Sequence, residues 1–126
     1  MSQRILVVED TDDNRRILRD LLVSAGFDLA EATDGIAGLE LAQAFRPDLI
    51  VMDIQLPRLD GYELARALRA DPALRDVPLV AVTSYALRGD AEKAREAGCN
   101  AYVTKPFSPR QLLATIRGLL GAPGHA

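Results

Sequence analysis

Short runs of consecutive apolar residues recur along the chain and predict buried β-strands. They cover Ile5–Val8, Leu49–Met52, Leu79–Val82 and the shorter Ala101–Val103. The first three runs do not alternate with polar residues, which is typical of strands in a parallel sheet that helices cover on both faces. A weaker run, Phe27–Ala32, alternates with acidic residues and predicts a strand at the edge of the sheet.

Between these runs, apolar residues recur at helical spacing and predict helices that pack on the sheet. The apolar stripes of the first two helices are Ile17, Leu18, Leu21, Leu22 and Ala25, and then Ile36, Leu39 and Phe45. Asp12 or Asp13 is expected to cap the first helix and Asp34 the second, because carboxylates accept hydrogen bonds from the free N–H groups of a first helical turn. Gly26 ends the first helix, and the second stops before Pro47.

Three further helices are predicted toward the C-terminus, with apolar stripes of unequal size. The third follows Gly61, the fourth covers about residues 89–97, and the fifth begins after Ser108, a capping residue followed by proline. The larger stripes are Leu64, Ala65 and Leu68 in the third helix and Leu112, Leu113, Ile116, Leu119 and Leu120 in the fifth. The fourth stripe is mostly alanine, so we expect this helix to be attached weakly to the sheet.

The elements alternate, strand then helix, five times. This order predicts the α/β class with a five-stranded parallel sheet. Crossovers between parallel strands are right-handed, and the common solution for five strands is the flavodoxin-like order 2-1-3-4-5, with helices on both faces. The chain suffices for one domain, which we assign to residues 1–121, and residues 122–126 are expected to form a short frayed tail.

Composition excludes several classes of function. A net charge of −3 argues against a dedicated nucleic-acid binder, which would carry a basic excess. No apolar run is long enough to span a membrane, and the first residues lack the features of a signal peptide, so we expect a cytoplasmic protein without membrane association. The single cysteine, Cys99, excludes an internal disulfide and a cysteine-based zinc site.

Polar residues follow the predicted strands at their carboxyl ends. In chain order, Glu9 and Asp10 follow the first strand, Asp53 the third, Thr83 the fourth and Lys105 the fifth. In an open parallel sheet the functional crevice lies beyond these ends, and the first and third strands flank the point where the strand order reverses. We therefore expect the carboxylates to meet there, with Thr83 and Lys105 approaching from one side.

Carboxylates that share one crevice repel each other unless positive charge offsets them. Mg²⁺ suits a site with few protein ligands and several waters, and Lys105 adds a further positive charge. An aspartate beside a hard cation, an ammonium group and a threonine hydroxyl is arranged for phosphoryl transfer, in which the carboxylate attacks phosphorus. The residues therefore predict an aspartyl phosphate.

The motifs at these strand ends resemble, in order and in sequence, those of the receiver domains of bacterial response regulators, the family of CheY. They are Val8-Glu9-Asp10, Met52-Asp53, Leu56-Pro57 with Asp60-Gly61, Val82-Thr83-Ser84 and Lys105-Pro106. The resemblance extends from Arg4 to about Leu120. The segments that are especially similar to single-domain regulators of the DivK type are Val8-Glu9-Asp10 with Asn14, Met52–Pro57 and Val82–Asp90.

The resemblance implies roles for the acidic residues and their neighbours. Asp53 would be the phosphoacceptor and a ligand of Mg²⁺. Asp10 would bind the ion directly and Glu9 through water, and the backbone carbonyl of Gln55 would supply another ligand. Glu9 stands where CheY has aspartate, and glutamate is a common alternative there.

The resemblance also implies how the signal would be read out. Thr83 and Lys105 would contact the phosphoryl group, and the Lys105–Pro106 bond would be cis. Tyr102 would be the aromatic switch residue, turning inward as Thr83 moves toward the phosphoryl oxygens. The readout surface would consist of the fourth helix, the fifth strand and the fifth helix.

These residues point to three functions from different classes, of which the first accounts for all of them. The first is a single-domain response regulator, which assists its own phosphorylation and dephosphorylation but is not otherwise an enzyme. It would take a phosphoryl group from a histidine kinase or histidine phosphotransfer protein and control a downstream protein target or form a homodimer. We expect its partner specificity to lie in exposed positions of the first helix, such as Asn14, Arg15 and Arg19.

The second function is hydrolysis of phosphate esters through an aspartyl-phosphate intermediate. Phosphatases of the haloacid-dehalogenase type carry a second aspartate two residues after the nucleophile, where this chain has Gln55, and the length leaves no room for a cap domain. The third is a phosphorylation-independent interaction module, against which the complete residue set argues.

Overall fold

The computed structural model describes residues 3–84 and 89–121, and these form five strands and five helices in alternation. The elements are β1 (Arg4–Val8), α1 (Asp12–Ser24), β2 (Asp28–Ala32), α2 (Gly35–Phe45), β3 (Leu49–Asp53), α3 (Gly61–Ala70), β4 (Leu79–Thr83), α4 (Asp90–Ala97), β5 (Ala101–Thr104) and α5 (Pro109–Leu120). The expected tail, residues 122–126, lies outside the described residues.

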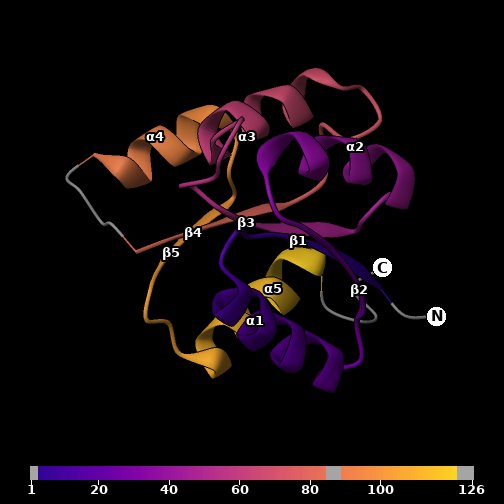
Figure 1. The fold of residues 1–126 in the computed structure, drawn as a ribbon, viewed down its shortest axis with the longest axis vertical. Coiled ribbons are helices and arrows are strands. Elements are labelled where there is room, and N and C mark those ends of the chain that lie inside the picture. Colours follow the sequence, from indigo (N-terminus) through magenta and orange to yellow (C-terminus); the bar gives the residue numbers. More distant parts are fainter. Residues whose placement is uncertain (1–2, 85–88, 122–126) are drawn as a thin grey trace.

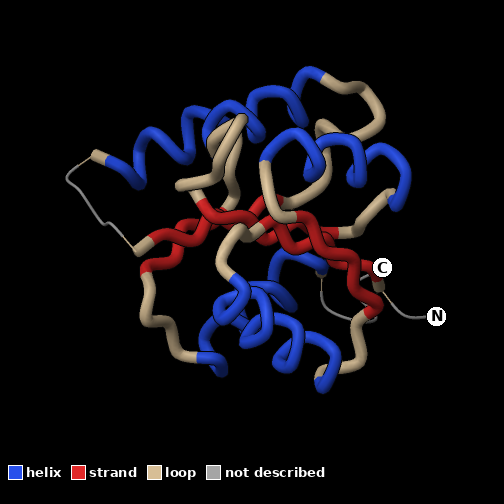
Figure 2. Tube along the Cα trace, viewed as in Figure 1, coloured by secondary structure: helices blue, strands red, loops and turns tan. Residues whose placement is uncertain are grey.

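The strands form one parallel sheet in the order β2-β1-β3-β4-β5, which confirms the predicted flavodoxin-like fold. Helices α2, α3 and α4 cover one face, and α1 and α5 cover the other (Figure 1). The sheet is therefore the middle of three layers (Figure 2). None of the helices within residues 3–84 and 89–121 has the length and apolar content that crossing a membrane requires.

Each face of the sheet has its own apolar core, because side chains of a strand alternate between the two faces. On the face of α1 and α5, Ile5, Val7, Val51, Val80 and Val82 pack with Leu18, Leu22, Leu112 and Ile116. On the other face, Leu6, Val8, Ile50, Met52 and Ala81 pack with Leu64, Leu68, Ala94 and Ala97. The strand register aligns the carboxyl ends of β1, β3, β4 and β5 at one edge, where the polar residues lie.

Helix α1 differs from its sequence-based expectation at two points. Its N-cap is Thr11, without a side-chain capping bond, rather than Asp12 or Asp13. Both aspartates lie in the first turn, where a carboxylate still interacts favourably with the helix dipole. Ile17, expected in the buried stripe, is 52% exposed because it lies at the margin of that stripe, beside a surface cavity.

Helix α2 turns small residues toward the sheet instead of the large ones predicted. Gly35, Gly38 and Ala42 are buried, whereas Leu39 and Phe45 are only partly buried and Ile36 is 37% exposed. The reason is a close approach, because a Cβ on Gly38 would lie 2.9 Å from Val8 Cγ2. The other predicted boundaries hold: Asp34 caps α2, Ser108 caps α5, and Gly98 ends α4.

Candidate functional site

The three acidic residues expected at the sheet edge lie together. Glu9 and Asp10 follow β1, Asp53 ends β3, and their carboxylate oxygens lie within 4.8 Å of one another. Glu9 is 1% exposed and Asp53 8%, whereas Asp10 lies exposed at the rim. The structure thus forms an acidic crevice between β1 and β3, with two carboxylates at its floor.

Lys105 reaches this crevice from the end of β5. Its Nζ donates hydrogen bonds to Glu9 Oε1 at 2.7 Å and to Asp53 Oδ2 at 3.0 Å. Its backbone N–H donates to the Thr83 carbonyl oxygen at 2.8 Å, which fixes the loop to the end of β4. The Lys105–Pro106 bond is cis, as the resemblance implies.

Burial and charge shift the pKa values of the paired groups. Burial raises the pKa of Glu9, and the hydrogen bond from Lys105 offsets this only in part. Burial by itself would lower the pKa of Lys105, but the hydrogen bonds to Glu9 and Asp53 outweigh it and raise that pKa. Both shifts favour the protonated form of the group, that of Glu9 because its carboxylate is buried and that of Lys105 because its ammonium group pairs with two carboxylates.

The second oxygen of Asp53 is held by the loop that follows β3. Asp53 Oδ1 accepts a hydrogen bond from the backbone N–H of Gln55 at 2.9 Å, and the Gln55 side chain is exposed. Helix α3 begins directly behind this turn, since a Cβ on Gly61 would lie 2.6 Å from the Asp53 carbonyl oxygen. Asp60 caps that helix through a capping box with Glu63, so the Asp60-Gly61 motif has a clear local role.

The same loop is pressed against the start of α2. A Cβ on Gly35 would overlap the Leu59 carbonyl oxygen, and the Gly35 N–H donates to the Pro57 carbonyl at 3.4 Å. This contact was not predicted, because nothing local in the sequence marks a close approach between segments so far apart. It limits the movement of the loop on which Gln55 lies.

The two remaining candidate residues lie on β4 and β5. Thr83 ends β4 and is buried, two strand ends away from Glu9 and next to Asp53 in the sheet. Tyr102 lies on β5, and its buried hydroxyl has no hydrogen-bond partner in the described part of the chain. It borders a cavity of about 250 Å³ that is also lined by Ala91, Ala94 and Cys99.

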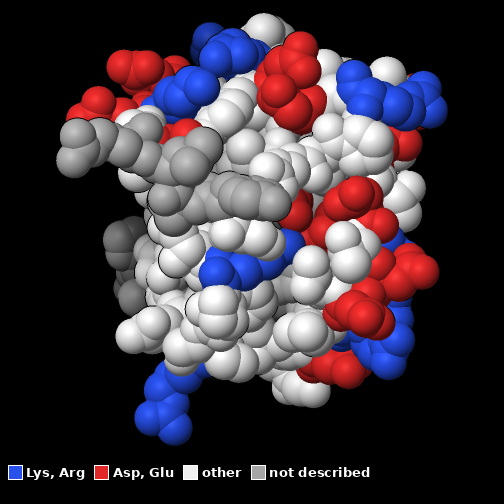
Figure 3. All heavy atoms as spheres, turned by 60° about the vertical axis from the view of Figure 1, so that its left-hand side comes forward, with Lys and Arg blue, Asp and Glu red and all other residues white. Residues whose placement is uncertain are grey.

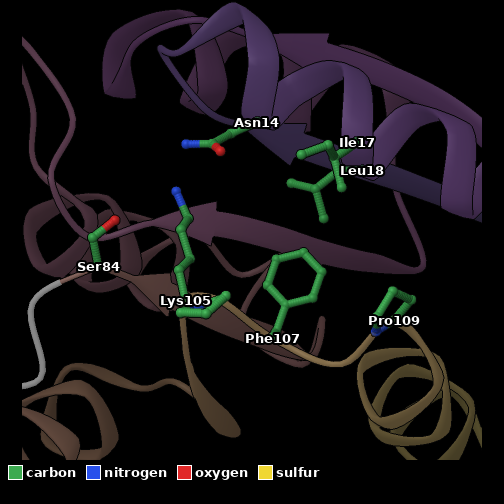
Figure 4. Close-up of a pocket in the computed structure, with 8 residues that line it drawn as sticks. Asn14, Ile17, Leu18, Ser84, Lys105, Phe107 and Pro109 are labelled. Carbon is green, nitrogen blue, oxygen red and sulfur yellow. The ribbon is translucent and has the colours of Figure 1, made fainter.

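A larger cavity of about 430 Å³ opens beside Lys105, lined mainly by apolar side chains. Figure 4 shows Phe107 facing Ile17 and Leu18 of α1 across it, with the Lys105 amine pointing toward Asn14. The space-filling view in Figure 3 shows acidic and basic side chains on one face, in several places side by side, with uncharged surface between these groups. The acidic crevice therefore adjoins a partly apolar recess.

The side chain of Arg15 does not lie where the sequence-based expectation placed it. It is only 14% exposed, and it donates from Nη1 to the Glu9 carbonyl oxygen at 3.1 Å. It therefore contacts the loop of Glu9 and Asp10 that follows β1, the acidic loop, rather than solvent. Arg19, at 45%, is exposed as expected. The sequence could not predict this contact, because Glu9 lies before α1 and helical spacing does not relate it to Arg15. The conformation of the loop before α1 decides that the Arg15 side chain points toward Glu9.

The fold defines the class of this protein, together with the residues at the strand ends and their motifs. The chain belongs to the response regulator receiver domain family, whose model matches residues 5–117. It is accordingly a protein of two-component signalling. Among its relatives, the polar-differentiation response regulator DivK of Brucella anthropi is 41% identical over 121 residues, covering 96% of this chain and 98% of DivK. DivK of Brucella ovis is 40% identical over the same shares of the two chains.

Solved structures agree with this assignment. The receiver domain of the sensor histidine kinase PA1611 from Pseudomonas aeruginosa, which carries a magnesium ion in its active-site cleft, is 38% identical with a TM-score of 0.88. The comparison covers 95% of this chain and 98% of that domain. The chemotaxis protein CheY4 of Vibrio cholerae is 27% identical with a TM-score of 0.89, covering 94% of this chain and 99% of CheY4.

Proposed function

We propose that this chain is a phosphorylation-controlled switch that accepts a phosphoryl group on Asp53. The observation that carries the proposal is the placement of Lys105 Nζ between Asp53 and Glu9, at the bottom of an acidic crevice in a receiver domain. The donor would be the phosphohistidine of a histidine kinase or of a histidine phosphotransfer protein, and the reaction would take place in the cytoplasm.

The transfer is a displacement at phosphorus. One carboxylate oxygen of Asp53 forms a bond to phosphorus, the P–N bond of the phosphohistidine breaks, and its electron pair returns to the imidazole. Lys105 offsets the negative charge on the phosphoryl oxygens while it stays bound to Glu9. The Thr83 hydroxyl, buried beside Asp53, donates to one phosphoryl oxygen. Water later cleaves the acyl phosphate and restores the carboxylate.

The donor atoms of the crevice fit a hard divalent cation. Three carboxylates converge within 4.8 Å, and one ammonium group leaves them with excess negative charge. Glu9, Asp10, Asp53 and the Gln55 carbonyl are the groups that would hold Mg²⁺. When bound, the ion supplies charge stabilisation for the transferring phosphoryl group.

The recess beside Lys105 is the surface on which we expect the phosphodonor to dock. It adjoins the crevice through Lys105, which pairs with Asp53, and its Phe107 and Ile17 side chains offer apolar contact to a partner. Positions on α1, such as the half-buried Asn14 that lines the recess and the exposed Arg19, would set partner specificity. The phosphorylated form would then act on a downstream protein, or on a second copy of the chain, through α4, β5 and α5.

The acceptor assignment is tested by intact-protein mass after incubation with acetyl phosphate, in Mg²⁺ or in EDTA. We expect one phosphoryl adduct in the wild type with Mg²⁺, none in EDTA and none in Asp53→Asn. Asp20→Asn, an exposed change of the same chemistry on α1, is the matched control and should label normally. Labelling of Asp53→Asn at the wild-type rate would refute the assignment. Beryllofluoride binding, followed by NMR, distinguishes an adduct too short-lived to detect from one that never forms.

The switch is tested separately by amide chemical shifts with and without beryllofluoride. We expect the largest changes across residues 84–106, which include α4 and Tyr102, because Thr83 would be drawn toward the new oxygens. Unchanged shifts in this range, in a protein that binds beryllofluoride, would contradict the proposed switch and leave the acceptor role intact.

A further inference from the structure

Arg15 links the acidic loop to two other segments of the fold. Its Nη1 donates to the Glu9 carbonyl oxygen at 3.1 Å, its Nη2 pairs with Asp12, and its Nε lies 3.5 Å from Glu31 Oε1 on β2. Asp12 and Glu31 therefore hold the guanidinium in place, and the guanidinium in turn holds a backbone carbonyl that lies between β1 and Asp10. A rigid, planar group with several donors is suited to such a three-way contact.

Arg19, one helical turn further, offers a natural comparison. It donates from Nε and Nη2 to the two carboxylate oxygens of Glu31, both at 2.8 Å. The two arginines thus share Glu31. Arg15 also holds the acidic loop, whereas the hydrogen bonds of Arg19 within residues 3–84 and 89–121 go to Glu31.

The Arg15 contact fixes the direction in which the chain leaves β1. The Glu9 N–H donates to the Ala32 carbonyl at 3.0 Å, and Arg15 holds the Glu9 carbonyl, so both backbone groups of this residue are bound. Because the peptide group is planar, holding that oxygen also orients the N–H and Cα of Asp10. The chain then folds back, and the Thr11 N–H donates to Glu9 Oε2 at 3.1 Å.

We infer that Arg15 is a positioning residue for the divalent-cation site, because it orients the loop from which Glu9 and Asp10 reach the crevice. This inference rests on the proposed function. When Arg15 is removed, the loss of its orienting contact and the loss of its charge should change the affinity for the cation in opposite directions. Removing a positive charge near the crevice would by itself tighten cation binding, whereas losing the orientation of Asp10 weakens it.

The experiment compares Arg15→Met with Arg19→Met in metal-free protein and during titration with MgCl₂ at fixed ionic strength, followed by amide NMR. Methionine keeps the apolar stem and removes the donors. We expect the Kd for Mg²⁺ to rise about tenfold in Arg15→Met and to stay near the wild-type value in Arg19→Met. In the absence of metal, hydrogen exchange of the Thr11 amide should speed up in Arg15→Met only.

The outcomes separate this inference from the proposed function. An unchanged or lower Kd in Arg15→Met would overturn the positioning role, and so would an equal rise in both variants, which would assign the effect to Glu31. If the wild type bound no Mg²⁺, the proposed function would fail, and Thr11 exchange would still decide whether Arg15 orders the loop.

Discussion

Helices α4 and α5 cover opposite faces of the same sheet and are attached to it by different forces (Figure 1). Helix α5 buries Leu112 and Ile116 completely, and each such side chain contributes about 1.5–3 kcal/mol of apolar burial. Helix α4 buries only Ala94 and Ala97, whose single methyl groups contribute about 0.8 kcal/mol each. The apolar attachment of α4 is therefore the weaker one.

Polar contacts compensate at the C-terminal end of α4. Arg69 of α3 donates from Nε and Nη2 to the Gly98 carbonyl oxygen at 3.0 and 2.7 Å, and from Nη2 to Asn100 Oδ1 at 2.8 Å. Its Nη1 donates to the Arg75 and Val77 carbonyls, both at 2.7 Å. Gly98 has a φ of +112°, and a Cβ there would lie 2.6 Å from Arg69 Cγ, so glycine is required at this contact.

The difference shows where a conformational change costs least. Helix α5 is fixed along its length by large side chains, whereas α4 is fixed chiefly by directional hydrogen bonds near residue 98. A movement of the first turns of α4 about that end would break few apolar contacts. The proposed switch, in which phosphorylation at Asp53 acts through Thr83 on α4, requires a helix attached in this way.

The comparison predicts unequal losses when the two helices are truncated. Ile116→Ala should lower the free energy of unfolding by about 3–4 kcal/mol, because it leaves a cavity in a close-packed core. Ala94→Gly should lower it by about 1.5 kcal/mol, from lost helix propensity and one buried methyl group. Urea denaturation measures both. Equal losses would show that α4 is held as firmly as α5.

The second prediction concerns the polar attachment of α4. Arg69→Met should lower the free energy of unfolding by about 2–3 kcal/mol, because several carbonyl oxygens lose a charged donor. Arg66→Met, at an exposed position on the same helix, is the matched control and should change it by less than about 0.5 kcal/mol. A loss no larger than the control's would mean that these carbonyls are satisfied as well by water.

Most of the fold could be predicted from local signals. Strands that are buried on both faces leave continuous apolar runs, and Asp34 and Ser108 cap their helices through bonds to residues three positions on. The candidate site was predictable for a related reason. Once the strand order is known, the residues at the strand ends must meet, and Glu9, Asp53 and Lys105 do so.

The contacts that the sequence did not predict join segments that are distant along the chain. Arg69 and Asn100 are separated by 31 residues, and an arginine on a helix gives no sign of which carbonyl it will reach. Gly38 of α2 packs on Val8 because the helix approaches the sheet closely, which no periodicity reveals. The inward direction of Arg15 likewise depends on Glu31 of a neighbouring strand.

The third prediction concerns Cys99, which follows α4, and the way in which its ionisation makes the stability of the protein depend on pH. Burial raises the pKa of Cys99 from 9.0 to about 11. Below pH 9 the thiol is neutral in both states, and as pH rises to 11 it ionises first in the unfolded chain, so stability is lost over this range. Relative to Cys99→Ala, the wild type should lose about 2 kcal/mol between pH 8 and 11 in urea denaturation. If the free energy of unfolding changed with pH equally in the wild type and in Cys99→Ala, the Cys99 thiol would be hydrated in the folded protein.

The smallest predicted effect is that of Tyr102→Phe, a substitution that should stabilise the protein rather than destabilise it. The Tyr102 hydroxyl is buried without a hydrogen-bond partner in the described residues, so its removal should raise the free energy of unfolding by about 0.5–1 kcal/mol. Tyr62→Phe, on α3, is the control and should give no gain. If the hydroxyl finds a partner when α4 moves, beryllofluoride should reduce the gain or reverse it, and Tyr102→Phe would then favour the resting state. An equal gain in both states would make Tyr102 a packing residue and leave the movement of α4 to be driven from Thr83 alone.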